Sequence, residues 1–318
     1  MTFTKLHGLG NDFIMMTLAQ LEKALKPFQH PSQPLEVNLN QLSSLAAYLC
    51  DRHFGIGADG IIVVAPPSAA YANTADVQFI YYNGDGSRAE MCGNGIRCFA
   101  NFIWQGDASR VELKVETPAG LLKTYLDPET GDVKVSMGPP RFLPEEIPFN
   151  VSASQSSFEL AGGFIARVPL SVLDRVVEVT AVSMGNPHAI LFSSDLDPAI
   201  YGPAIETHPA FPAKTNVEFV EIISQTPERA HLKVVVWERG CGFTLACGTG
   251  ACAVAVAARR LGLVSANHIA IELPGGVLDI EWDPKSPEGF QSEVWMRGPV
   301  KSVFEGQVKV PAAVLTGP

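Results

Sequence analysis

Two short motifs combine a cysteine with glycines in an arrangement that can support chemistry: Met91-Cys-Gly-Asn-Gly-Ile-Arg-Cys98 and Ala246-Cys-Gly-Thr-Gly-Ala-Cys252. In each, a strand-like run leads through the glycines into an apolar, helix-like stretch. The first N–H groups of such a helix lack internal partners and carry partial positive charge, so they favour a carboxylate. The same potential favours the thiolate of a cysteine placed there. Cys92 and Cys247 are therefore the candidate reactive residues.

Two thiols that face each other suit the inversion of a stereocentre. One removes the α-proton as a thiolate, and the other returns a proton to the opposite face as a thiol. N–H groups of both helices would meet the negative charge that develops on the reacting carboxylate, as in an oxyanion hole. This scheme requires no cofactor. No Cys and His residues have zinc-finger spacing, so we expect no metal either.

The surroundings of the two motifs repeat as well. A β-like run ends at the same distance before each cysteine, in Asn83 and in Glu238. Three further pairs of segments match in the same order: Val115–Gly120 with Ile271–Gly276, Met137–Pro140 with Met296–Pro299, and Gly10–Asp12 with Gly185–Pro187. Ordered matches at near-equal spacing indicate two similar domains in tandem. We expect one domain over residues 1–137, to which 298–318 return, and a second over 138–297.

Short strands dominate the remainder. Alternating runs such as Arg110–Glu116 and His231–Val236 indicate strands, whereas helices are expected at Leu39–Cys50 and at the two glycine motifs. Residues 66–74 read as a surface insertion, and residues 144–163 read as a loop or the crossing between domains. The pattern predicts an α+β protein with two β-rich domains, each holding a helix.

Bulk properties narrow the class of protein. The chain has 318 residues, 47% of them hydrophobic, and a net charge of −10, which argues against nucleic acid or an anionic membrane as partner. Apolar runs such as Ala251–Ala258 are too short to span a bilayer. The first residues resemble no signal peptide, so we expect a cytoplasmic protein. In that setting the six cysteines are expected to be free thiols.

Five blocks, in order, resemble the signatures of diaminopimelate epimerases: Phe3–Phe13, Gly55–Asp59, Asn83–Ser87 with Met91–Cys98, Met184–His188, and Trp237–Gly240 with Ala246–Cys252. The resemblance implies two pseudo-symmetric, β-barrel-like domains, each around a central helix, with the active site in the cleft between them. It implies that LL- and meso-diaminopimelate are interconverted in lysine and cell-wall synthesis, without pyridoxal phosphate or metal. A homodimer is also implied.

The resemblance also assigns roles by position. Cys92 and Cys247 would transfer protons, while His188 and Glu238 would tune them. Another group of residues would bind substrate: Asn11, Asn83, Gly93, Asn94, Asn186, Asn216, Glu238, Arg239, Gly248 and Thr249. Among these, Arg239 suits the remote carboxylate, because a guanidinium can bind a carboxylate through two parallel hydrogen bonds. His7 is expected to be structural.

Three departures from the family pattern stand out. Gly60 replaces a glutamine that contacts substrate in some members. Phe243 replaces a polar residue before the second cysteine, and Cys241 is added nearby. Extra length occurs near residues 66–76 and 149–180.

Other readings stay open. A proline or hydroxyproline racemase would share the two cysteines, but its substrate has no distal carboxylate for Arg239. A catalytically silent binding protein would have no need of both cysteines with His188 and Glu238. A thiol redox protein usually places its two cysteines closer together than Cys92 and Cys98, or Cys247 and Cys252. Cys98 and Cys252 fall inside the expected helices and are predicted to be packing residues.

Overall fold

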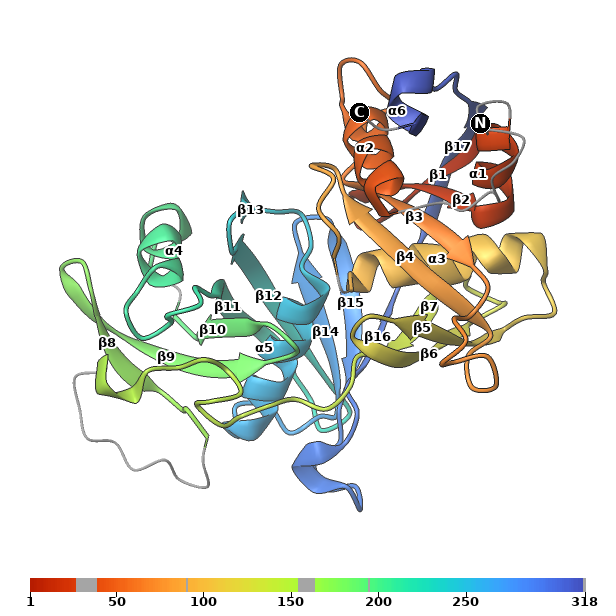
Figure 1. Ribbon diagram of the computed structural model, residues 1–318. Coiled ribbons are helices and arrows are strands. Elements are labelled where there is room, and N and C mark those ends of the chain that lie inside the picture. The colour runs from red at the N-terminus through yellow and green to blue at the C-terminus, as the bar shows by residue number, and fades with distance from the viewer. Residues whose placement is uncertain (27–38, 90, 154–163, 194, 317–318) are drawn as a thin grey trace. The chain divides into compact units, whose positions relative to one another are not determined.

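The computed structural model describes residues 1–26, 39–89, 91–153, 164–193 and 195–316. Contacts divide the chain into two compact units (Figure 1). Unit 1 comprises Met1–Val135 and Pro299–Pro318, and unit 2 comprises Ser136–Gly298.

Unit 1 is built on one curved run of strands. They are β1 (Thr2–Gly8), β2 (Asn11–Thr17), β3 (Gly60–Ala65), β4 (Val77–Asn83), β5 (Glu112–Thr117), β6 (Gly120–Leu126), β7 (Val133–Ser136, at the unit boundary) and β17 (Lys301–Gln307). Neighbours pair in the order β17-β1-β2-β3-β4-β5-β6-β7. The β2–β3 and β4–β5 pairs are parallel and the others antiparallel. Parallel neighbours need a crossover, and helices lie in both of these connections.

Unit 2 repeats this order. Its strands are β8 (Val168–Val172), β9 (Arg175–Ser183), β10 (Pro187–Leu191), β11 (Asn216–Gln225), β12 (Arg229–Glu238), β13 (Gly242–Phe243), β14 (His268–Leu273), β15 (Gly276–Glu281) and β16 (Trp295–Gly298). They pair as β8-β9-β10-β11-β12-β14-β15-β16, with β10–β11 and β12–β14 parallel. The short β13 also pairs with β12. The duplication inferred from the motifs is therefore confirmed as a structural repeat within an α+β fold.

A helix lies at the centre of each unit: α3 (Gly93–Gly106) in unit 1 and α5 (Gly248–Arg260) in unit 2. Helix α3 contacts β1, β2, β3 and β6, and α5 contacts β9, β10, β11, β14, β15 and β16. Residues 93–101 and 250–258 are buried without interruption. The small Ala and Val side chains of α5 suit a helix that is buried on all sides, whereas α3 also buries the polar side chains of Asn94, Arg97 and Asn101.

The remaining helices are peripheral. The predicted α2 is found at Leu39–Cys50, whereas α1 (Leu18–Leu25), α4 (Pro198–Glu206) and α6 (Ala312–Thr316) were not predicted. Two of them carry start signals in the sequence. Thr17 and Gln20 form a capping box at α1, and Asp197 caps α4 with Pro198 in the first turn. Both helices are short, with eight and nine residues, so each offers only about two turns from which a helical period can be recognised.

The predicted insertion at residues 66–74 is a largely exposed loop without strands. Part of the predicted loop at residues 144–163 also lies in the described chain. There, Ile147 and Phe149 are buried in the core of unit 2. Residues 154–163 lie outside the described residues. The extra length expected near 149–180 includes β8 and part of β9.

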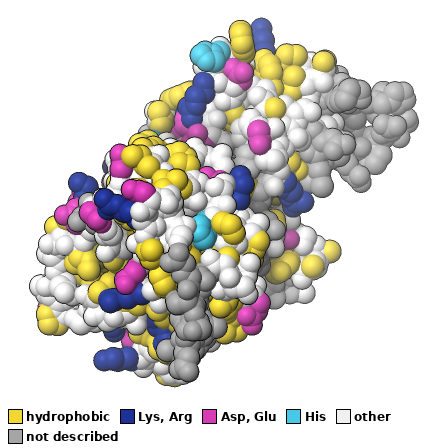
Figure 2. All heavy atoms as spheres, turned by 90° about the vertical axis from the view of Figure 1, so that its left-hand side faces the viewer, with side chains coloured by type: hydrophobic (Ala, Val, Ile, Leu, Met, Phe, Trp, Pro, Cys, Tyr) yellow, Lys and Arg dark blue, Asp and Glu magenta, His cyan; other side chains and the backbone are white. Residues whose placement is uncertain are grey.

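Among the described residues, no helix is long and apolar enough to cross a membrane. On the face of the molecule in Figure 2, Lys and Arg side chains lie scattered among Asp and Glu side chains. That face presents no continuous basic stripe of the kind that tracks a nucleic-acid backbone, as far as its described residues extend.

Candidate active site

Each candidate cysteine is the N-cap residue of its central helix. The Cys92 sulfur accepts a hydrogen bond from the Gly95 N–H at 3.4 Å, and the Cys247 sulfur accepts one from the Gly250 N–H at 3.4 Å. Glycine is required for this approach in unit 2, because a β-carbon on Gly250 would lie 3.3 Å from the Cys247 sulfur and 2.7 Å from a Glu218 oxygen. Both sulfurs therefore sit where free helix N–H groups concentrate positive potential.

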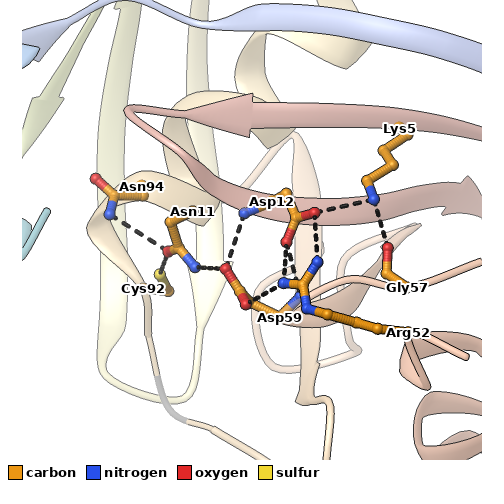
Figure 3. Close-up of polar contacts among 8 residues, drawn as sticks. All are labelled: Lys5, Asn11, Asp12, Arg52, Gly57, Asp59, Cys92 and Asn94. Carbon is orange, nitrogen blue, oxygen red and sulfur yellow. Dashed lines mark hydrogen bonds and ion pairs between the residues drawn. The ribbon is translucent and has the colours of Figure 1, made fainter. Parts of the chain in front are cut away.

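Two of the predicted asparagines lie beside Cys92 (Figure 3). The Asn11 amide oxygen accepts hydrogen bonds from the Cys92 thiol at 3.5 Å and from the Asn94 amide nitrogen at 3.3 Å. The Asn11 amide nitrogen donates to the Asp59 carboxylate at 2.6 Å. The first residue of β2, the N-terminus of α3 and the residue before β3 therefore meet at Asn11 in unit 1.

Asn83 ends β4 and lies in the tight turn that leads toward the cysteine motif. Its side-chain nitrogen donates to the Ser87 hydroxyl at 2.9 Å. Gly60 faces Asn83 on the neighbouring strand β3. A β-carbon on Gly60 would lie 2.5 Å from both the Tyr81 ring and the Tyr82 carbonyl oxygen. A glutamine does not fit here without a backbone shift, so packing explains the departure at this position.

Cys247 lies in a buried, acidic environment. Burial, followed by the charges of Glu238 and Glu218, raises the pKa of the Cys247 thiol well above its usual range. Hydrogen bonds from the Thr249 hydroxyl and the Gly250 N–H act in the opposite direction but are weaker effects. Burial likewise raises the pKa of Glu238, although the Thr244 hydroxyl donates to its carboxylate. Burial and the neighbouring carboxylates therefore favour the protonated thiol form of Cys247.

A buried histidine and carboxylate support this thiol. The His188 ring contacts Glu218 at 2.6 Å through Nδ1, and both side chains are fully buried. Through Nε2 the ring contacts the Asn186 amide oxygen at 3.0 Å. The Asn186 nitrogen donates to the Thr249 hydroxyl at 3.4 Å, and that hydroxyl lies 3.5 Å from the Cys247 sulfur. A continuous polar chain therefore runs from Glu218 to Cys247.

Glu218 is a residue that sequence reasoning missed. It lies on β11 within Asn216-Val-Glu-Phe219, and all four of these residues are buried. An acidic residue inside a buried strand is an informative signal, since an unpaired charge there is costly. The parallel pairing of β10 with β11 places His188 opposite Asn216, two residues before Glu218.

Asn216 and Arg239 are joined to each other. The buried Asn216 amide donates to the Pro187 carbonyl oxygen at 2.9 Å and accepts from the Arg239 backbone N–H at 3.0 Å. Its amide can form one more bond at each end. The exposed Arg239 side chain donates to the Ala213 carbonyl oxygen at 3.1 Å, which leaves further guanidinium N–H groups for an anion.

All six cysteines are free thiols, as predicted. Cys98 and Cys252 are buried inside α3 and α5, and burial raises the pKa of Cys98 to about 12. Cys241 is exposed after β12, and Phe243 packs edge-on against Trp237 with 5.1 Å between the ring centres. Among the described residues, no three His, Cys, Asp or Glu side chains form a group able to hold a metal ion.

Comparison with known proteins identifies the family of the chain. A family model described as diaminopimelate epimerase matches residues 3–143 and 180–303. A diaminopimelate epimerase of Carboxydothermus hydrogenoformans is 45% identical over 96% of this chain and 99% of its own. One of Halothermothrix orenii is 40% identical over 98% of both chains.

Solved structures with low sequence identity share the fold. A phenazine biosynthesis protein of the PhzF family from Bacillus anthracis has a TM-score of 0.62 at 15% identity, covering 97% of this chain and 99% of its own. A hydroxyproline epimerase from Agrobacterium vitis has a TM-score of 0.59 at 15% identity, covering 97% and 90%. These likenesses concern the fold alone. The family model matches both halves, and the curated relatives match nearly the full length, so this chain belongs to the diaminopimelate epimerase family.

Proposed function

We propose that this protein is a diaminopimelate epimerase that interconverts LL- and meso-diaminopimelate by inverting one α-carbon, in lysine and peptidoglycan precursor biosynthesis. The observation that carries the proposal is the pair of equivalent helices, each capped by a cysteine whose sulfur accepts a helix N–H. Family membership supplies the substrate class.

Cys92 and Cys247 are the two proton-transfer residues in this proposal. The thiolate of one removes the α-proton, and the thiol of the other protonates the opposite face of the resulting carbanion. In the reverse direction the two exchange roles. The chemistry requires both sulfurs to reach the α-carbon of one substrate molecule. We take the two domains as residues 1–137 with 298–318, and residues 138–297.

Backbone N–H groups at the two helix starts bind the reacting carboxylate. Gly93 and Asn94 serve this purpose in one half, and Gly248 and Thr249 in the other. As negative charge develops during proton removal, these donors stabilise it without reorganisation. The helix positions are supported by the hydrogen bonds of the first turns.

The rest of the substrate binds through polar side chains: Asn11, Asn83, Asn186, Asn216, Glu238 and Arg239. Arg239 holds the remote carboxylate, because its guanidinium is exposed and Ala213 is the one partner of its N–H donors among the described residues. Asn216 fixes the backbone from which Arg239 extends.

Glu238 and His188 tune the second thiol. Cys247 hydrogen-bonds to Glu238, whose pKa is raised by burial. A carboxylate of raised pKa is a better proton acceptor, so Glu238 takes the Cys247 proton when this cysteine must act as the base. His188 orients Asn186 and, through it, Thr249.

Assembly and location complete the proposal. We propose a cytoplasmic homodimer, on the strength of the family resemblance and the composition of the chain. Size-exclusion chromatography with light scattering measures the mass directly, and a mass near 34.1 kDa would contradict the dimer.

Isotope exchange tests the reaction. The protein is incubated under reducing conditions with LL-diaminopimelate, or with proline as the comparison, in deuterated water. We expect deuterium at the α-carbon and inversion of diaminopimelate only. Absence of exchange with every diaminopimelate isomer would refute the function, and turnover of proline would favour the racemase reading.

Cysteine variants test the assignment of the catalytic pair. Cys92→Ala and Cys247→Ala should each abolish epimerisation, whereas Cys98→Ala should keep turnover and lose stability. A Cys98→Ala protein that folds normally but has no activity would show that the wrong cysteine has been chosen.

A further inference from the structure

Unit 1 contains a network of charged residues next to Asn11, the residue that contacts Cys92 (Figure 3). Proton transfer and substrate binding do not explain this network. It joins two carboxylates, Asp12 and Asp59, to two cations, Lys5 and Arg52. Asp12 contacts Lys5 and Arg52 at 2.9 Å each, and Asp59 contacts Arg52 at 2.8 Å. The network is reached from Cys92 through one side chain, Asn11.

Backbone geometry locks the two carboxylates together. The Asp12 N–H donates to the Asp59 carboxylate at 3.0 Å, and the Asp59 N–H donates to the Asp12 carboxylate at 3.0 Å. Burial raises the pKa of Asp12, but hydrogen bonds from Arg52 and Lys5 outweigh it and lower that pKa overall. The carboxylates are thus held as a balanced pair against two positive charges. One Asp59 oxygen pairs with Arg52, and the other accepts both the Asp12 N–H and the Asn11 amide nitrogen.

Hydrogen bonds through Asn11 have a fixed direction. At one end the buried Arg97 guanidinium, which can only donate, donates to the Asn94 amide oxygen at 2.8 Å. Asn94 must then turn its nitrogen toward the Asn11 oxygen, at 3.3 Å. At the other end the ionised Asp59 carboxylate can only accept, and it receives the Asn11 nitrogen at 2.6 Å.

The orientation of the Asn11 amide decides whether its oxygen or its nitrogen contacts the Cys92 sulfur. Because the nitrogen is held by Asp59, the oxygen faces the sulfur, and the thiol donates to it at 3.5 Å. A reversed amide would present N–H groups to the sulfur and favour a thiolate instead. A hydrogen bond to a charged acceptor is shorter and stronger than a neutral one, so Asp59 is a firm anchor.

We propose that Asp59 is a positioning residue for epimerisation: its carboxylate orients the Asn11 amide so that the amide oxygen faces the Cys92 thiol. This inference rests on the proposed function for its catalytic consequence. The effect of Asp59 on Cys92 through Asn11 can be measured without substrate.

A double-mutant cycle tests whether Asp59 acts through Asn11. The proteins are the wild type, Asp59→Ala, Asn11→Ala and the double variant, each checked for folding by circular dichroism. In the wild-type background, Asp59→Ala should lower kcat/KM by about tenfold or more, as loss of an orienting partner does at other sites. In the Asn11→Ala background the same change should cost less than about threefold, because the orienting effect has already been lost.

The second readout is the alkylation of Cys92 by iodoacetamide as a function of pH, followed by peptide mass spectrometry. Asp59→Ala should move the midpoint of Cys92 labelling down by about one pH unit, a tenfold change in thiolate population. Part of this shift comes from removing a negative charge, and that part persists in the Asn11→Ala background. The part that depends on Asn11 measures orientation.

Two further variants make the result decisive. Asp59→Asn keeps the size of the side chain, and we expect the same pattern at smaller amplitude, which also covers a failure of Asp59→Ala to fold. Arg52→Gln removes exposed ion pairs but leaves the Asp59–Asn11 bond, so its kcat/KM should stay within about threefold of the wild type.

Equal effects of Asp59→Ala in both backgrounds would overturn the proposal, since Asp59 would then act through charge or folding alone. Unchanged kcat/KM and labelling in the folded Asp59 variants would overturn it too. If the wild type turned over no diaminopimelate while the labelling cycle behaved as expected, the proposed function would fail and the positioning role would stand.

Discussion

The buried pair of His188 and Glu218 yields a quantitative prediction for stability. Both side chains are fully buried, and the Glu218 oxygen lies 2.6 Å from Nδ1 of His188. Glu218→Ala removes the carboxylate and leaves Nδ1 of the His188 ring without this partner in a buried site. Breaking a buried pair that includes a carboxylate, by removing one member, costs about 3–5 kcal/mol. Glu218→Ala should therefore lower the free energy of unfolding by that amount.

Glu218→Gln is the matched control. The amide has nearly the same volume and keeps an oxygen that can accept from Nδ1, so the hydrogen bond survives without the carboxylate charge. The other Glu218 oxygen has no hydrogen-bond partner among the described residues, so its replacement by an amide nitrogen breaks no hydrogen bond. We expect a loss of about 1 kcal/mol, the net value of an ordinary hydrogen bond.

Urea denaturation, monitored by circular dichroism and extrapolated linearly to water, measures both values. The same proteins carry a second signature. The charge of Glu218 raises the pKa of Cys247, so both variants should label Cys247 faster at a given pH. If Glu218→Ala cost less than about 1 kcal/mol, or if Gln and Ala destabilised equally, the pair would not hold this part of unit 2 and the reasoning would be wrong.

Three further predictions follow from the same contacts. Burial raises the folded-state pKa of Glu238 above its ordinary 4.5, so ionisation of Glu238 destabilises the fold as pH rises from about 4.5 to the folded-state pKa. Glu238→Gln should therefore gain stability relative to the wild type as pH rises through this range, and it should lose activity. Thermal unfolding and turnover at several pH values measure the two effects. Gly250→Ala should slow turnover at least tenfold, since its β-carbon would lie 2.7 Å from a Glu218 oxygen and crowd the Cys247 sulfur. Gly120→Ala is the control: Gly120 lies in open space at positive φ, so this change should leave kcat/KM unchanged and reduce stability only. Thr17→Ala breaks the capping box of α1 and should cost about 1 kcal/mol in urea denaturation, with no change in kcat.

Local interactions explain what could be read from the sequence alone. A cysteine that caps a helix, the glycines after it and the N–H groups they expose all lie within four residues of one another. The duplicated order of these motifs determined the repeated architecture, because each copy carries the same strand, helix and hairpin signals. Helix α4 was missed although Asp197 and Pro198 signal its start, since Gly202 and Pro203 interrupt its pattern.

Tertiary structure decided which side chains the carboxylates of Asp59 and Glu218 contact. Asp59 meets Asn11 across 48 residues because β2 and β3 pair in parallel, and Glu218 meets His188 across 30 residues because β10 and β11 do the same. Neither acid was assigned a role from the sequence, although Asp59 ends the Gly55–Asp59 block. Strand register sets such contacts, and register depends on the packing of a whole sheet around its helix rather than on neighbouring residues. The sequence by itself located the two cysteines and their helices, while the tertiary structure brought Asp59 to Asn11 and Glu218 to His188.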